Sequence, residues 1–332
     1  MSDQSATTDV NVNVNDAKQI YIGDVGPGVK KRDPILIADS VTRTFGGNTA
    51  VNVEHVEIPR NMITALIGPN GAGKTTFFNL LTGFDKPNSG NWTYDGQKLA
   101  GVPAFKVARR GMVRTFQLTK SLALLSVMEN MRLGATKQKG ENIFRAMLPF
   151  LWRDQEKANT AKAMELLGRF KLDTKKDDYA ASLSGGQRKL LEMARALMSD
   201  PDLVMLDEPM AGVNPALTQS LLGHILGLKD QGMTVLFVEH DMHMVQTIAD
   251  WVIVMAEGKI VAEGYPSVVM QDQAVIDAYL GAHHDVDLGT LTGQLAVAED
   301  IDPHLVEELR EEVSADPELA EELAEEQNRT EQ

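Results

Sequence analysis

The sequence predicts an α/β fold in which the buried strands of a parallel sheet alternate with helices. A glycine-rich stretch, Gly68–Thr76, lies between an apolar run and a helical pattern. Two further runs of mostly apolar residues, which we expect to be buried strands, are each followed directly by acidic residues. They are Leu203–Leu206 and Thr234–Val238. Such runs are typical of parallel strands covered on both faces, and open sheets of this kind bind ligands at the carboxyl ends of their strands.

The chain begins with a polar segment, residues 1–34, in which Asn alternates with Val before several Gly and Pro residues. Its apolar content is low, so we expect a flexible leader, with an added edge strand as the alternative. Short strands are predicted at residues 35–38, 41–45 and 51–58, because apolar residues gather or alternate there and turn residues separate them.

The stretch Gly68–Thr76 matches the pattern G-x-x-x-x-G-K-[ST] of the phosphate-binding P-loop. Residues 62–67 are predicted to form a buried strand and residues 76–81 a helix, which is the strand–loop–helix context that this motif requires. Gly71 and Gly73 allow the backbone to turn tightly enough that several N–H groups point at one anion. The loop therefore predicts a binding site for phosphate groups.

Two side chains extend this prediction from a phosphate to a nucleotide. Lys74 supplies a positive charge for the β- and γ-phosphates, and the Thr75 hydroxyl can ligate Mg²⁺ at a helix N-terminus that favours anions. Phe45 lies 23 residues before Gly68, and an aromatic side chain ahead of a P-loop can stack on a nucleobase. The alternative is a core phenylalanine at the end of a strand.

Beyond the loop, the pattern is mainly helical. Strands are expected at residues 92–95 and 113–117, whereas residues 122–179 have mostly helical periodicity. An unusually apolar stretch, Glu141–Trp152, is either the core of a helical subdomain or a docking surface for another subunit. A strong helix is predicted over residues 188–198, directly after the sequence L-S-G-G-Q.

Acidic and histidine side chains follow the two buried runs. Asp207 ends a hydrophobic run, as in a Walker B motif, and can hold Mg²⁺, often through water. Glu208 is adjacent and could orient an attacking water molecule. His240 follows the strand Thr234–Val238 and could contact a γ-phosphate, with a solvated histidine as the alternative.

The last predicted element of the body is an amphipathic helix over residues 267–280. From Asp285 to Gln332 there are sixteen Asp and Glu residues and two Arg residues, so this tail holds nearly all of the chain's net charge of −15. The remainder is close to neutral. Because nucleic-acid binding usually requires a basic excess, we expect no nucleic-acid partner.

The tail contains an internal repeat: residues 302–312 recur 14 residues later as residues 316–326. Each unit begins with Asp-Pro, a helix start signal, but carries few apolar side chains. We expect two short, marginal acidic helices. They serve either as a solubilising tail or as a regulatory, partner-binding tail.

Composition excludes several classes of protein. The chain has 43% hydrophobic and 24% charged residues, which is ordinary for a globular protein. It has no apolar run of transmembrane length, and its first residues lack the basic and apolar regions of a secretory signal. The absence of cysteine excludes disulfides and thiolate chemistry and fits a reducing compartment.

The order of these motifs resembles the ATP-binding subunit of ABC transporters over residues 35–282. Leu183–Gln187 matches the ABC signature and is the most specific of the motifs. The resemblance implies a P-loop NTPase (RecA-like) core with an antiparallel β subdomain and an inserted helical subdomain at about residues 118–199. The leader, residues 1–34, and the acidic tail, residues 283–332, lie outside it.

The resemblance also implies roles for single residues. Phe45 would stack on adenine, and Glu208, His240 and Gln117 would be catalytic. Mg²⁺ would be held by Thr75, Gln117 and Asp207. The residues implied to contact ATP through the P-loop are Gly68, Asn70, Gly71, Gly73, Lys74, Thr75 and Thr76. The signature residues implied to contact the ATP of a second subunit are Ser184, Gly185, Gly186 and Gln187.

A narrower resemblance, carried by residues 114–117, 211–215, 238–242 and 278–281, is to the branched-chain amino acid importer branch. It implies an ATPase that energises import of such amino acids or similar small polar solutes. The implied partners are a second ATPase subunit, identical or paralogous, in a nucleotide-sandwich dimer, then permease subunits and, indirectly, a solute-binding protein. The implied location is cytoplasmic, on the inner face of the cell membrane.

Three alternatives remain open at this point. The first is an ATPase of the same branch that serves export of lipid or lipopolysaccharide. The second is a urea importer. The third is a soluble, non-transport ABC switch ATPase.

Overall fold

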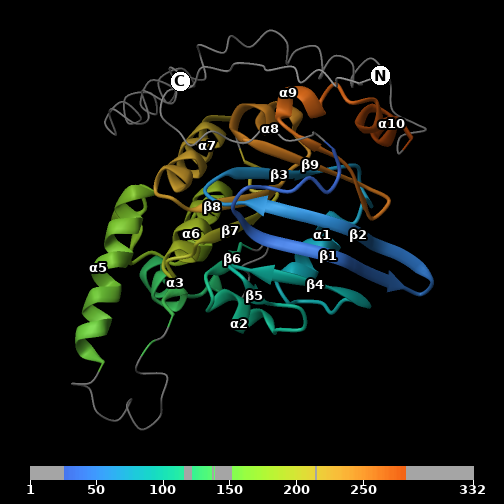
Figure 1. Ribbon diagram of the computed structural model, residues 1–332. Coiled ribbons are helices and arrows are strands. Elements are labelled where there is room, and N and C mark those ends of the chain that lie inside the picture. The colour runs from blue at the N-terminus through green and yellow to red at the C-terminus, as the bar shows by residue number, and fades with distance from the viewer. Residues whose placement is uncertain (1–25, 116–121, 137, 139–151, 214, 282–332) are drawn as a thin grey trace, which may run out of the picture.

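A computed structural model describes residues 26–115, 122–136, 138, 152–213 and 215–281 (Figure 1). Within these ranges, no helix has both the length and the apolar character that crossing a bilayer requires. Several predicted features lie outside the described residues. They are Gln117, Asn214, the apolar stretch Glu141–Trp152 except for Trp152 itself, and the whole acidic repeat.

The N-terminal part forms a four-stranded antiparallel sheet in the order β2-β1-β4-β5. In β1, Ser40 has a φ of 51° and the pairing with β4 shifts register, so the two short strands predicted for this region form one bulged strand. A Cβ on Gly90 would lie 2.3 Å from the Ser40 carbonyl oxygen, so only glycine fits beside the bulge. The strands are β1 (Pro34–Phe45), β2 (Asn48–Pro59), β4 (Ser89–Tyr94) and β5 (Gln97–Lys98).

The second sheet has six strands in the order β10-β9-β3-β8-β7-β6. All of its neighbouring pairs are parallel except β9 with β10. The sequence prediction of an α/β fold with a parallel sheet is therefore confirmed. The strands are β3 (Ile63–Ile67), β6 (Met112–Arg114), β7 (Leu203–Asp207), β8 (Thr234–Val238), β9 (Trp251–Ala256) and β10 (Lys259–Gly264).

Helix α1 (Lys74–Leu81) lies between the two sheets (Figure 1). Its Phe77 and Phe78 are buried in one cluster with residues of the antiparallel sheet and with one face of the parallel sheet, including Leu66 and Met205. Burying two aromatic side chains removes a large apolar area from water, which fixes the start of this helix against the sheet.

The opposite face of the parallel sheet forms a second core with most of the remaining helices. Its alternate strand residues, such as Ala65 and Leu206, point to this side. The helices of this layer are α3 (Val127–Gly134), α5 (Arg153–Arg169), α6 (Gly185–Leu197), α7 (Pro215–Asp230), α8 (Met242–Ile248), α9 (Pro266–Val269) and α10 (Gln273–Gly281). Helix α2 (Ala104–Ala108) and the 3-10 turns Asp173–Lys175 and Ala180–Ser182 complete the fold.

Two predicted helix boundaries were wrong. The helix expected at residues 188–198 begins at Gly185, because Ser184 caps it. The single helix expected over residues 267–280 is divided into α9 and α10. The division follows from Asp272, whose carboxylate accepts the Ala274 N–H at 2.8 Å and starts a new helix.

Residues 26–33, which we had placed in the predicted leader, lie against both sheets. The Val29 N–H donates to Glu263 Oε1 at 3.0 Å, and the Lys31 ammonium forms an ion pair with the same carboxylate on β10. The Lys31 N–H donates to Glu57 Oε2 on β2 at 2.5 Å. Glu263 is completely buried and also accepts from Trp251 Nε1 at 3.1 Å.

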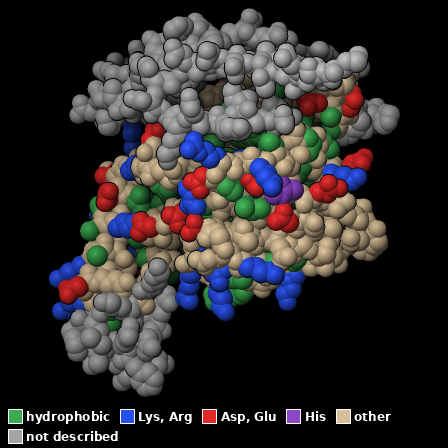
Figure 2. Space-filling view, viewed as in Figure 1, with side chains coloured by type: hydrophobic (Ala, Val, Ile, Leu, Met, Phe, Trp, Pro, Cys, Tyr) green, Lys and Arg blue, Asp and Glu red, His purple; other side chains and the backbone are tan. Residues whose placement is uncertain are grey.

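The charges of the face shown in Figure 2 are interspersed across its middle, and Lys and Arg side chains gather along its lower edge. In the orientation of Figure 1, this lower edge belongs to the region of β4, β5 and α2. The sequence of this region supplies Lys98, Lys106, Arg109 and Arg110, all exposed.

We predict that Lys31→Met destabilises the folded chain strongly. The variant leaves the buried Glu263 carboxylate without its cation, and breaking a buried ion pair by removing one partner costs about 3 kcal/mol. Urea unfolding monitored by tryptophan fluorescence measures the change. The control is Lys176→Met, which removes an exposed pair with Asp177; it should change the free energy of unfolding by less than about 1 kcal/mol. Equal effects of the two variants would contradict the prediction.

Candidate functional site

The P-loop connects β3 to α1 through a close backbone approach. Gly68 has a φ of 147° and Gly73 a φ of 99°. A Cβ on Gly68 would lie 1.9 Å from the Met255 carbonyl oxygen, and one on Gly73 would lie 2.2 Å from the Ala50 carbonyl oxygen. No side chain fits at either position, because the backbones of β9 and β2 lie directly against the loop.

The curved loop presents unpaired donors. Within the described residues, no backbone hydrogen bond is donated by the N–H groups of Gly71, Gly73, Lys74 or Thr75, whereas the Phe77 N–H already donates to the Gly73 oxygen at 2.8 Å. These free groups lie at the start of α1, where the helix dipole favours negative charge. The arrangement fits the binding of a phosphate group.

Lys74 lies over the loop that precedes it. Its ammonium donates to the carbonyl oxygens of Gly68 at 2.6 Å and Pro69 at 2.9 Å. Burial lowers the pKa of Lys74, and the nearby carboxylates of Glu208 and Asp207 act in the opposite direction. The structure therefore brings the P-loop lysine and both acidic residues into one electrostatic neighbourhood.

Asp207, at the end of β7, is held by Arg114 from the neighbouring strand β6. Arg114 Nη2 donates to Asp207 Oδ2 at 2.5 Å and Nη1 donates to Asn79 Oδ1 on α1 at 2.6 Å. The Arg114 guanidinium also lies 5.5 Å from the centre of the Phe78 ring. A charge-assisted bond of this kind orients the carboxylate and leaves its second oxygen available.

Glu208 follows with a φ of 46°, which is rare for a residue other than glycine. Its N–H donates to the Val238 oxygen at 3.0 Å. Lys189 of α6 donates to the Glu208 oxygen at 3.0 Å and to the Pro209 oxygen at 2.8 Å. A left-handed conformation costs an L-residue about 1–2 kcal/mol, so these contacts hold Glu208 against its own preference.

His240 and Glu239 follow β8, which lies between β3 and β7. The His240 side chain is 68% exposed, and its Nδ1 lies 3.7 Å from Glu239 Oε2. Glu239 is buried and accepts the Met210 N–H at 2.9 Å and the His240 N–H at 3.3 Å. Burial raises the pKa of Glu239 despite these bonds. Glu239 thus anchors the loop after β7, and the His240 side chain beside it is exposed at the same sheet edge.

The oxygen atoms available for a divalent cation suit Mg²⁺. The described residues contain no cluster of three or more metal-ligating side chains. The Thr75 hydroxyl is at the exposed start of α1, and the Asp207 carboxylate has one oxygen outside the Arg114 contact. Mg²⁺ is usually held by one or two such groups together with water and substrate phosphates, so this sparse set fits it.

The signature residues form the start of α6. The Ser184 hydroxyl accepts the Gln187 N–H at 3.2 Å, and the Gln187 side-chain oxygen accepts the Ser184 N–H at 3.1 Å, which is a capping box. Gly185 is exposed, whereas a Cβ on Gly186 would lie 1.6 Å from Leu217 of α7. In the described part of the chain, no hydrogen bond or ion pair joins these residues to the P-loop.

Of the two other predicted residues, Phe45 lies at the surface and Gln117 lies outside the described residues. Phe45 is 48% exposed, and the Arg43 guanidinium lies 4.3 Å from the centre of its ring. The ring is therefore a surface feature and not part of the core, which was the alternative interpretation. Gln117 lies outside the described residues, although Thr115 just before it donates its N–H to the Met205 oxygen at 3.0 Å.

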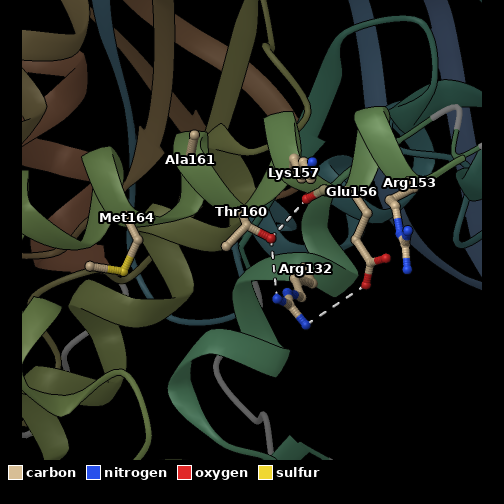
Figure 3. A pocket seen from close by; sticks show the side chains of 7 residues that line it. All are labelled: Arg132, Arg153, Glu156, Lys157, Thr160, Ala161 and Met164. Carbon is tan, nitrogen blue, oxygen red and sulfur yellow. Dashed lines mark hydrogen bonds and ion pairs between the residues drawn. The ribbon is translucent and has the colours of Figure 1, made fainter.

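Two pockets differ in their relation to these residues. One of about 360 Å³ lies beside the ends of β6 and β7 and is lined by Asp207, Glu208 and Lys189, among others. The other, about 480 Å³, lies between α3 and α5, where Arg132 donates to Thr160 Oγ1 at 3.2 Å (Figure 3). The second pocket contains none of the predicted site residues.

Sequence reasoning missed three residues of the site. Arg114 was noted only as part of a motif, although a cation at the end of a strand next to an acidic strand end is a signal for pairing. Glu239 was passed over in favour of its exposed neighbour His240. No sequence pattern indicated Lys189, since its contacts with the Glu208 and Pro209 oxygens depend on where α6 lies relative to the end of β7.

A family model described as "ABC transporter" matches residues 51–211. The "Probable branched-chain amino acid transport ATP-binding protein LivG" of Archaeoglobus fulgidus is 39% identical over 248 residues, which are 75% of this chain and 96% of that protein. The "High-affinity branched-chain amino acid transport ATP-binding protein LivG" of Escherichia coli (strain K12) is 39% identical over 251 residues, 75% of this chain and 98% of that protein.

Solved structures give a consistent result. A nucleotide-free ATP-binding cassette from an ABC transporter has a TM-score of 0.65 and 33% sequence identity, and the match covers 74% of this chain and 98% of that chain. The ADP conformation of an ATP-binding cassette of an ABC transporter has a TM-score of 0.65 and 32% identity, with 75% and 99% covered.

We predict that the glycines of the loop differ in their tolerance of a methyl group. Gly73→Ala should unfold at a clearly lower temperature, because its Cβ would overlap the Ala50 carbonyl oxygen, which is backbone and cannot rotate away. Gly71→Ala should lose only about 1 kcal/mol, because its Cβ meets nothing within 4 Å and only its φ of 81° is unfavourable. Differential scanning calorimetry of the two nucleotide-free variants measures both effects. Equal losses would contradict this account of the loop.

Proposed function

The chain belongs to the ABC transporter family of ATP-binding proteins, and we propose that its ATPase activity drives the uptake of branched-chain amino acids or similar small polar solutes. The family membership establishes an ATP-binding ATPase subunit with the ABC ATPase fold. The solute class is supported by the printed names of relatives that are covered over nearly their whole length. The observation that carries the proposal is the strand register, which places the start of the P-loop and the acidic pair Asp207 and Glu208 at one edge of the parallel sheet, with unpaired P-loop N–H groups beside them.

ATP is bound, in this proposal, by the P-loop cradle. The free N–H groups at the start of α1 would surround the β-phosphate, and Lys74 would leave its two carbonyl partners for the phosphate oxygens. Phe45 would stack on the adenine once Arg43 moves from the ring. Thr75, Asp207 and Gln117 would hold Mg²⁺, which supplies neutralisation of phosphate charge.

Hydrolysis requires a positioned water molecule and stabilisation of the charge that develops on the γ-phosphate. Glu208 is next to Asp207, and its backbone is held in an unfavourable conformation that sets the direction of its Cα–Cβ bond. We assign Glu208 the orientation of the water and exposed His240 the contact with the γ-phosphate. Gln117 is assigned to the same centre by its motif alone.

A second ATPase subunit completes the site. The signature residues Ser184, Gly185, Gly186 and Gln187 begin a helix whose positive end favours a phosphate. No hydrogen bond or ion pair joins them to the P-loop among the described residues, and each chain contains one loop and one signature. Two chains arranged head to tail would therefore place two ATP molecules between a loop and a signature each.

The remaining partners follow from the class of transporter. ATP-binding subunits of importers work with permease subunits. We propose that ATP-dependent closure and opening of the dimer is converted by the permeases into alternating access, at the inner face of the cell membrane. A solute-binding protein would deliver the solute, so specificity would lie outside this chain.

We predict that Glu208→Gln abolishes ATP hydrolysis and retains ATP binding. The amide keeps the shape of the side chain but cannot orient water as a carboxylate does, and loss of such a group typically lowers kcat by a factor of about 10² to 10⁴. Phosphate release measures turnover, and equilibrium binding of a fluorescent ATP analogue measures affinity. Turnover at the unaltered rate would refute the role of Glu208.

Pairing of two copies has its own test. Lys74→Ala removes the P-loop cation and Ser184→Arg blocks the signature, so each variant alone should be inactive. A mixture should regain part of the activity, because a mixed dimer contains one intact loop opposite one intact signature. Phosphate release by the mixture and by each variant alone measures this. A mixture as inactive as its components would contradict pairing of this chain with itself.

A further inference from the structure

The unfavourable conformation of Glu208 is fixed from both sides of the residue. On its amide side, the N–H donates to the Val238 oxygen at 3.0 Å, which ties it to the neighbouring strand β8. On its carbonyl side, the oxygen accepts from the Ala211 N–H at 3.2 Å and from Lys189 Nζ at 3.0 Å. A residue with a φ of 46° keeps this conformation only while its surroundings determine it.

Lys189 makes the strongest of the contacts on the carbonyl side. Its ammonium bridges two successive carbonyl oxygens, those of Glu208 at 3.0 Å and Pro209 at 2.8 Å. Bonds from an ionised donor are about twice as strong as neutral ones. Two bonds from one charged group therefore fix the orientation of the peptide that follows Glu208.

Burial lowers the pKa of the Lys189 ammonium, and three glutamate side chains act in the opposite direction. They are those of Glu239, Glu192 and Glu208. Glu239 is buried at the end of β8 and holds the Met210 N–H of the same loop. The lysine thus lies at the point where β7, β8 and the loop after β7 meet.

Lys189 belongs to the helix that carries the signature. Helix α6 begins immediately after Ser184, whose capping box with Gln187 fixes the first turn. Lys189 is in the second turn, so a displacement of the signature helix relative to β7 would shift the ammonium that holds the Glu208 carbonyl. A side chain on a regular helix follows the position of that helix.

We propose that Lys189 is a positioning residue for ATP hydrolysis, which ties the signature helix to the Glu208–Pro209 backbone and thereby orients the Glu208 carboxylate. Through Lys189, the position of α6 determines whether Glu208 is directed at the water. This inference rests on the proposed function, since it assumes that Glu208 acts in hydrolysis. In this proposal, Lys189 acts through the backbone of Glu208 and Pro209 and not on ATP or water.

The test compares Lys189→Met, Lys189→Gln and Lys189→Arg in the full-length chain. Displacing a catalytic group by a fraction of an ångström to 1 Å lowers turnover by up to about 100-fold, so we expect kcat of Lys189→Met to fall about 10- to 100-fold. KM for ATP should change by less than about threefold, because the P-loop is untouched. Lys189→Arg should recover most of the loss, since a guanidinium can also bridge two carbonyl oxygens. Lys189→Gln, which keeps a neutral hydrogen-bond donor group and serves if Met is not tolerated, should lie between them.

Lys162 provides a matched control. Its ammonium donates to the Met198 carbonyl oxygen at 3.0 Å and pairs with Asp200, so it too binds a carbonyl near one end of α6, but away from the nucleotide loop. Lys162→Met should leave kcat and KM within about twofold of the parent, because its partners Met198 and Asp200 lie at the opposite end of α6 from the signature.

The outcomes separate this inference from the proposed function. If Glu208→Gln still hydrolyses ATP, the proposed function fails whatever Lys189 does. If Glu208→Gln is inactive while Lys189→Met and Lys189→Gln turn over ATP as the parent does, only the positioning role is refuted. A loss of kcat that Arg does not restore, or a rise in KM equal to the loss of kcat, would show a merely structural lysine and would also overturn it.

Discussion

The site depends on the parallel register of three neighbouring strands. Val238 at the end of β8 pairs with Leu66 of β3 on one side and with Asp207 of β7 on the other. Strands in a sheet lie about 4.8 Å apart, so the start of the P-loop, the acidic pair and His240 leave the sheet at one level and within two strand spacings. A shift of one strand by a single residue would turn its side chains to the opposite face and separate these groups.

Much of what lies at this edge of the sheet could be predicted from the sequence. The loop at residues 68–76 and the acidic residues after Leu206 were found because short-range patterns specify them: glycines at fixed spacing, and an apolar run that ends in a carboxylate. The capping box at Ser184 was also present in the sequence as S-x-x-Q, but the helix was predicted to begin at residue 188. The division of the last helix at Asp272 was missed as well. Its apolar residues continue across the break, so the pattern predicted one helix, whereas the capping side chain of Asp272 starts a second one.

The unpredicted parts depend on contacts between segments far apart in the chain. Arg114 meets Asp207 because β6 pairs with β7, and Lys31 meets Glu263 across more than two hundred residues. Lys189 reaches the Glu208 carbonyl only through the packing of α6 on the end of β7. The spacing of residues along one segment does not predict which residues of distant segments it will contact. Motifs therefore predict which residues would bind the nucleotide, whereas the residues that hold these in place became visible only in three dimensions.

The structure also shows how the cations of the site are held by the protein itself. Lys74 donates to two carbonyl oxygens of its own loop, Arg114 is paired with Asp207, and Lys189 bridges the carbonyls after Glu208. A buried cation without such partners would be strongly unfavourable. Lys74 and Lys189 both donate only to neutral carbonyl oxygens, but Lys74 belongs to the phosphate-binding loop, and bonds to ionised phosphate oxygens are stronger. Lys74 therefore gains by exchanging its partners for phosphate, whereas Arg114 and Lys189 have more to lose, one held by a carboxylate and the other set among three. The site thus separates one cation that is ready to move onto the substrate from two that keep the carboxylates in position.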